Sequence, residues 1–267
     1  MLNYRRYPLF LWILFTVMGM ALLSGCSLKS GPKSFDRPEK SYIREAPEAS
    51  AVLAKAFEKT TREGQKFYFS GWAGTKIQKR SNGYYLIGSM DRQKGYSVDA
   101  TIFGQPFRYY RWGKDVYVSE GEKWRKASPS EIPLEPFTDF VKLSFLTGKA
   151  VRDHDDTMFG QKCSKYVITL NADEVIKAAR AMGVELSQDE EALSTPYLKQ
   201  LRMKMSIWVG QEDNMIYKYM TQTNMPVPGA GSIFQEVSFK FWKYNHPGLK
   251  LPGPEKLKQY LIKEEKD

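Results

Sequence analysis

The feature that most restricts the fold of this chain is an alternation of apolar and polar residues. In LRMKMSIWV (201–209) the odd positions are apolar and the even positions are polar, with Trp208 as the exception. Successive side chains of a β-strand point to opposite faces, so this alternation predicts a strand with one buried and one solvated face. Comparable segments occur at 65–74, 83–91, 95–104, 105–113, 115–121, 122–128, 149–156, 161–170, 215–225 and 232–242. We therefore expect an antiparallel sheet of about ten strands.

Only a few segments have helical patterns. Residues 48–63 place their apolar residues on one stripe at helical spacing, and residues 171–183 begin at Asn171, a favourable capping residue. Shorter helices are expected at 137–147 and 255–264. These helices are too few to form a separate layer of their own, so they are expected to pack on the sheet.

A long antiparallel sheet with one apolar face must cover that face. The sheet can curl on itself, or the few helices can fill its concave side. Both together predict an α+β fold: a strongly curved antiparallel half-barrel of about ten strands, with a few helices covering the concave face. The acidic segment 184–197 is expected to form a surface loop or lid.

The N-terminal region has the organisation of a secretion signal, with basic Arg5 and Arg6 before an apolar run at 9–23. About 15 residues are too few to span a bilayer as a helix, which needs roughly 20. The run ends in LSGC (23–26), which resembles the bacterial lipobox. That resemblance implies cleavage before Cys26 and attachment of a diacylglycerol to its sulfur. We therefore expect a signal peptide at 1–25, an acylated cysteine and flexible tether at 26–47, and a single domain at 48–267.

Composition and charge restrict the partners. The chain has 42% hydrophobic residues, 26% charged residues and a net charge of +10, which is typical of a folded domain with a basic surface. On a membrane-anchored protein, such a surface suits anionic lipid or an anionic cell-wall polymer. Nucleic acid is not an expected partner, because an exported protein seldom meets it, and we expect a monomer. Acylation of Cys26 would leave Cys163 as a lone structural thiol.

Motifs for catalysis or metal binding are missing from the sequence. His154 and His246 are the only histidines, and the carboxylates around His154 (RDHDD, 152–156) are predicted to be a solvated hairpin end. Neighbouring side chains of a strand point to opposite faces, so they seldom converge on one ion. Two carboxylates could still meet from distant strands, as in glycosidases, but the sequence favours no such pair. We expect neither an enzyme, a cofactor nor a metal site.

A large stock of apolar side chains is predicted to share one face of the sheet. They form either a packed core or the lining of an elongated cavity for an acyl chain, and methionine and aromatic residues suit the second role. The candidates are Phe67, Phe69, Tyr96, Val98, Met203, Met205, Ile207, Tyr217, Tyr219, Val237, Phe239 and Phe241.

Three stretches resemble proteins of the LolA/LolB/LppX-like lipoprotein carrier group. They are YYRWGKDVYVSEGEKWRKA (109–127), MSIWVGQEDNMIYKYM (205–220) and FKFWKYNHPGLKLPGP (239–254). The resemblance implies a curved antiparallel sheet with helices on its concave face. It also implies a lipoprotein, anchored outside the cytoplasm, that carries a lipid or another hydrophobic ligand. The alternative is a non-enzymatic envelope sensor or assembly module with the same fold. The anchoring membrane is either the cell membrane or, in a two-membrane bacterium, the outer membrane.

Overall fold

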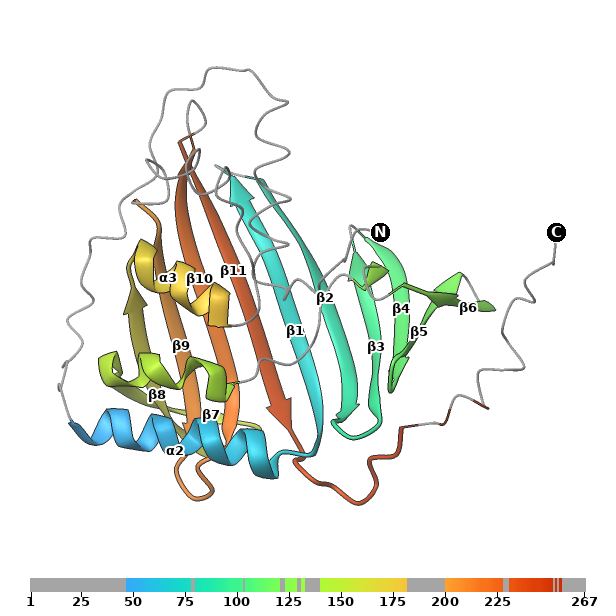
Figure 1. Ribbon diagram of the computed structural model, residues 1–267, viewed down its shortest axis with the longest axis horizontal. Helices are drawn as coiled ribbons and strands as arrows, with labels where there is room; N and C mark the ends of the chain where they lie inside the picture. Colours follow the sequence, from blue (N-terminus) through green and yellow to red (C-terminus); the bar gives the residue numbers. More distant parts are fainter. Residues whose placement is uncertain are drawn as a thin grey trace.

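The computed structural model describes residues 47–77, 80–102, 104–120, 123–128, 131–132, 140–181, 200–227, 231–251, 253 and 255. Their strands form a single antiparallel sheet (Figure 1). The strands are β1 (Lys66–Ile77), β2 (Arg80–Asp91), β3 (Gly95–Ile102), β4 (Gln105–Trp112), β5 (Asp115–Glu120), β6 (Lys123–Ala127), β7 (Val151–Met158), β8 (Gln161–Leu170), β9 (Arg202–Gly210), β10 (Ile216–Val227) and β11 (Gly231–Trp242). The expected antiparallel sheet is therefore confirmed, with 11 strands in place of about ten.

The strand order is β6-β5-β4-β3-β2-β1-β11-β10-β9-β8-β7. The first and last strands pair at the centre, with Tyr68 opposite Trp242 and Ile77 opposite Ile233. All other neighbours in the sheet are also neighbours in sequence, as hairpin-like segments predict. The sheet is open, with β6 and β7 at its two edges, and together with its helices it fits the expected half-barrel.

Three helices lie on the same side of the sheet in Figure 1: α2 (Pro47–Glu63), η2 (Phe140–Lys149) and α3 (Ala172–Ala181). Their main strand contacts are with β7, β8, β9 and β10. We call this side of the sheet the inner face and the opposite side the outer face. The helices expected at 48–63 and 171–183 are confirmed within one or two residues. The helix expected at 137–147 is a 3₁₀-helix shifted towards Lys149.

Two expectations fall on parts of the chain outside the described residues. These are the acidic loop at 184–197 and almost all of the C-terminal helix at 255–264. The signal segment and tether expected at 1–47 also lie outside them, apart from Pro47. None of the described helices is long and apolar enough to cross a membrane.

Helix α2 is held against the sheet by its apolar stripe and by its last turn. Leu53, Ala56 and Phe57 have no exposed surface. In the last turn, the Ile216 backbone N–H donates to Thr60 Oγ1 at 3.0 Å, so a helix hydroxyl satisfies a backbone group of β10. The apolar stripe therefore faces the core, as its spacing predicts.

Helix α3 begins with a reciprocal capping box. The Glu174 N–H donates to Asn171 Oδ1 at 3.1 Å, and the Asn171 N–H donates to Glu174 Oε2 at 3.0 Å. We predict that Asn171→Ala lowers the free energy of unfolding by about 1 kcal/mol, because the Glu174 N–H loses its acceptor. Urea denaturation would measure this loss. Asn171→Asp keeps an acceptor and should stay near wild type; equal losses in both variants would contradict a capping role.

Candidate ligand-binding face

Eleven of the twelve sequence-predicted lining residues, all except Tyr217, lie in one hydrophobic cluster on the inner face. They come from β1, β3, β9, β10 and β11, and each is between 0% and 7% exposed. The alternation of the strands therefore assigned the correct face to these side chains. Their low exposure also shows that they are packed against other protein atoms.

Tyr217 is placed differently because the pairing of β9 with β10 is irregular. Ile216 pairs with Val209 and Lys218 pairs with Trp208, so the register shifts at Tyr217. A β-bulge inserts one extra residue and breaks the two-residue period. As a result, Tyr217 packs in a smaller cluster with Cys163 and Trp208, away from its expected neighbour Tyr219.

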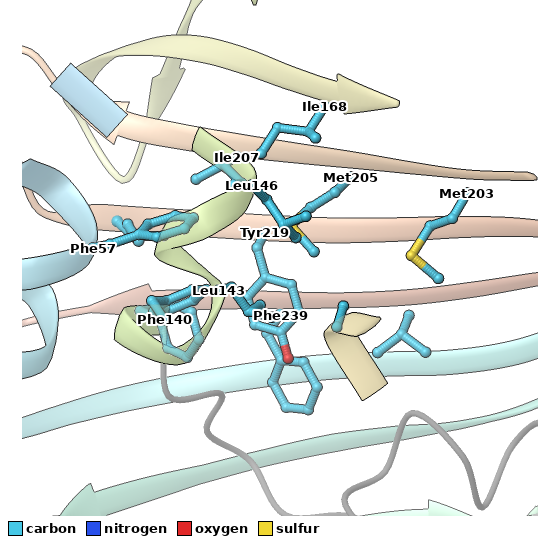
Figure 2. Close-up of a cluster of buried hydrophobic side chains, with 14 of the residues drawn as sticks. Phe57, Phe140, Leu143, Leu146, Ile168, Met203, Met205, Ile207, Tyr219 and Phe239 are labelled. Atoms are coloured by element: carbon cyan, nitrogen blue, oxygen red, sulfur yellow. The ribbon is translucent and has the colours of Figure 1, made fainter. Parts of the chain in front are cut away.

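The helices contribute inner-face residues that the sequence did not single out. Figure 2 shows Phe57 of α2 and Phe140, Leu143 and Leu146 of η2 facing the side chains of the sheet. The ring centroids of Phe57 and Phe140 are 5.4 Å apart, and those of Phe140 and Tyr219 are also 5.4 Å apart. Phe140, Leu143 and Leu146 recur at every third position, which is the period of a 3₁₀-helix and was the available signal.

The apolar inner face continues beyond the strands on which the three helices mainly pack. Leu86 of β2, Val98 of β3, Tyr109 of β4 and Val118 of β5 are buried members of the same cluster. Tyr109 also stacks edge-to-face against Tyr96, with centroids 6.0 Å apart. Among the inner-face residues of β2 to β5, only Tyr96 and Val98 were singled out from the sequence. The alternation in β2 and β4 could also have indicated Leu86 and Tyr109.

A polar band crosses the inner face near one end, where Ile233 lies beyond it. Gln235 of β11 pairs with Thr75 of β1 on one side and with Thr223 of β10 on the other. Thr221, the next inner-face residue of β10, is buried as well, as are Thr223 and Gln235. A hydroxyl or amide placed in an apolar environment requires a hydrogen-bond partner. The mostly apolar inner face therefore contains a band of hydroxyl and amide groups, with Met203 and Met205 opposite it on β9.

The acidic hairpin segment around His154 is occupied by internal contacts. Oδ2 of Asp153 lies 2.8 Å from Nζ of Lys165, and Oδ1 of Asp153 lies 3.2 Å from Nδ1 of His154. Arg152 donates to Asp155 at 2.8 Å and holds the pKa of that carboxyl below its usual value. Among the described residues, no three His, Cys, Asp or Glu side chains are arranged to hold a metal ion.

Cys163 lies on the outer face, in the small cluster with Trp208, Met215 and Tyr217. Burial raises the pKa of its thiol to about 11. The thiolate is the reactive form of cysteine, so this side chain is an inert packing residue near neutral pH.

The fold and the site define an α+β domain with one open antiparallel sheet and an apolar, helix-covered inner face. No protein-family model matches the chain, and no curated protein matches it. Solved structures to which it is similar include the lipoprotein LppX of Mycobacterium tuberculosis, with 12% identity over 78% of this chain and 100% of that chain and a TM-score of 0.46. LprF of Mycobacterium bovis has 12% identity over 78% and 98% of the two chains and a TM-score of 0.46. A LolA superfamily protein of Nitrosomonas europaea has 13% identity over 73% and 91%, with a TM-score of 0.28.

Proposed function

We propose that this protein is a membrane-anchored extracytoplasmic lipoprotein that binds a lipid or another hydrophobic ligand along its inner face. The observation that carries the proposal is the length of the apolar inner face, which runs from β8 across the centre of the sheet to β5. Anchoring through Cys26 rests on the sequence of residues 23–26 alone.

The polar band refines the expected ligand. An acyl chain would lie along the aromatic and methionine side chains, and a polar head group would meet Thr223 and Gln235 near one end of the face. Binding sites of this kind are mostly apolar, with a small number of polar groups that fix orientation. The chemistry favours an amphiphile with a single polar end over a plain hydrocarbon.

Because the inner-face side chains are buried, binding requires a covering element to move. Helix η2 is suited to this role, since a 3₁₀-helix of 10 residues is long for its type and its hydrogen-bond geometry is weaker than that of an α-helix. Its inner side chains Phe140, Leu143 and Leu146 cover the face that an acyl chain would occupy. In this proposal η2 acts as a displaceable plug.

Ligand binding is tested with the chain from Ser27 to Asp267, which contains every described residue. Native mass spectrometry and solvent extraction should detect a co-purifying lipid. After delipidation, the protein should bind a long-chain fatty acid more tightly than an alkane of the same length. Failure to retain a lipid, together with failure to bind either probe, would contradict the carrier function and favour the sensor or assembly alternative.

Substitution of the polar band makes the test specific. Thr223→Val keeps the shape of the side chain and removes its hydroxyl, so we predict roughly tenfold weaker fatty-acid binding with little change for the alkane. Thr101→Val is the matched control, because Thr101 is exposed on the outer face. Equal loss of affinity for both probes would contradict a head-group role for the polar band.

A further inference from the structure

The outer face carries an aromatic side chain that lies flat on the sheet. Trp72 of β1 is followed two residues later by Gly74, which pairs with Gly83 of β2. A Cβ atom placed on Gly83 would lie 2.4 Å from Cη2 of Trp72, and one on Gly74 would lie 2.5 Å from Cζ2. The indole therefore lies over the two glycines, and one face of the ring is turned away from the sheet.

Two exposed apolar residues extend this surface along β2. Tyr85 is directly opposite Trp72, and Ile87 is the next residue of β2 on the outer face. Trp72, Tyr85 and Ile87 are 38%, 49% and 43% exposed. We call these three residues the outer platform. A contiguous exposed apolar patch of this kind on a folded protein commonly marks an interaction site.

Small hydroxyl side chains surround the outer platform. Each platform residue has a hydroxyl residue opposite it on a neighbouring strand. Ser238 is opposite Trp72, Ser70 is opposite Ile87, and Thr101 is opposite Tyr85. Within the described part of the chain, the side chains of Ser70, Ser238 and Thr101 make no hydrogen bond. The rim of the platform thus offers donors and acceptors to a polar partner.

Positive charge lies next to the platform. Lys240 of β11 is opposite Ser70 of β1 and opposite Lys218 of β10, so two lysines face each other across neighbouring strands. Directly opposed like charges destabilise a sheet. Burial and the charge of Lys240 together lower the pKa of Lys218. Neither lysine forms an ion pair with a described carboxylate, although Trp208 stacks against Lys218, with Nζ 4.2 Å from the ring centroid.

Acidic groups near the platform partly offset this charge. Glu236 accepts a hydrogen bond of 3.0 Å from Gln222, and Glu236 and Asp156 both counter the positive potential at Lys218. Asp99 is exposed next to Ile87, on the side of the platform away from the lysines. An anion bound beside Lys240 and Lys218 would relieve their mutual repulsion.

We infer that the outer platform, with Lys218 and Lys240, binds an anionic polysaccharide. A sugar ring can place its C–H groups against the flat, electron-rich face of Trp72 and its hydroxyls against the serine and threonine rim. Carboxylate or phosphate substituents of the same polymer would reach the two lysines. A membrane would prefer apolar side chains without the hydroxyl rim. The flat indole of Trp72 suits the broad face of a sugar ring better than the anchor residues of a protein partner. The inference concerns the outer face and is independent of ligand binding on the inner face.

The test uses the full chain in detergent micelles and three polymers of matched length: polygalacturonate, neutral dextran and polyglutamate. We expect measurable binding to polygalacturonate that weakens as salt is added, and at least tenfold weaker binding to the other two polymers. Equal affinity for polyglutamate would overturn the inference, because charge alone would then explain binding. Anionic vesicles lacking glycolipid should not compete with polygalacturonate, and competition by them would favour a lipid surface instead.

Variants locate the binding surface. Tyr85→Ser should weaken polygalacturonate binding roughly tenfold by removing an exposed aromatic ring, and Lys240→Gln should weaken it roughly threefold and reduce its salt dependence. Trp72 is left intact, since it also covers the two glycines. Phe145→Ser and Lys142→Gln are the matched controls. Both residues are exposed on η2, on the other side of the sheet from the platform, and both variants should bind like wild type. Unchanged affinity in both Tyr85→Ser and Lys240→Gln would overturn the inference.

Discussion

Phe239→Ala is expected to lower the free energy of unfolding by about 3–5 kcal/mol, the range found when a buried phenylalanine is truncated. Phe239 has no exposed surface, and its ring centroid lies 5.5 Å from that of Tyr219 and 6.5 Å from that of Phe69. A Cβ atom placed on Gly71 would lie 2.7 Å from Cε1 of Phe239, so the ring fills the space above this glycine. Truncation therefore leaves a cavity at the centre of the sheet.

Urea denaturation followed by far-UV circular dichroism would measure this loss. Phe145→Ala is the matched control: Phe145 is 41% exposed on η2, and its truncation should cost less than about 1 kcal/mol. Similar losses in the two variants would contradict the assignment of Phe239 to the core. A loss below about 1 kcal/mol for Phe239→Ala would do the same.

Gly95→Ala is expected to have an effect of similar size through the backbone. Gly95 begins β3 with a φ of +144°, and a Cβ atom there would lie 1.9 Å from the carbonyl oxygen of Arg111 on β4. No side-chain rotation can relieve a contact between a Cβ atom and a neighbouring backbone. We expect β3 and β4 to separate locally, at a cost of about 3 kcal/mol or more.

Gly113 provides the control for backbone conformation alone. It has a φ of +56°, and nothing lies within 4 Å of a Cβ atom placed there. Gly113→Ala should therefore cost about 1 kcal/mol, the strain of a left-handed residue without a clash. Denaturation midpoints of the two variants would separate strain from clash. Equal midpoints would show that the strands yield to the extra methyl group at Gly95.

Much of the fold was predictable from the sequence because strand patterns are local. The alternation in 201–209 and 232–242 placed Met203, Ile207 and Phe239 on the same face, and the structure confirms this. The helix expected at 171–183 was also confirmed, since its capping box is a local arrangement between Asn171 and Glu174. Pairing of β1 with β11 could not be read in this way, because it joins distant segments whose patterns are alike.

The limits of prediction at the candidate site have identifiable physical causes. Tyr217 was grouped with Tyr219 because both occupy odd positions, and the β-bulge between Ile216 and Lys218 breaks that relation. The plugging residues Phe140 and Leu143 were missed because a 3₁₀-helix has a period of three rather than the helical period that was sought. Alternation places Tyr85 on the outer face, but it does not indicate whether other segments of the chain cover that face. Whether the twelve lining candidates bind a ligand stays a prediction.

The position of β1 between β2 and β11 also governs the order in which the protein can fold. Strands β1–β6 pair with sequence neighbours, as do β7–β11, so each half can assemble by local hairpins. Joining the halves must wait until β11, which begins at Gly231, has left the ribosome. During that interval β1 is an unpaired edge strand of 12 residues with aromatic side chains, the type of edge on which chains aggregate. Because this long-range contact forms slowly, the protein is expected to be most prone to aggregation before β1 and β11 have paired.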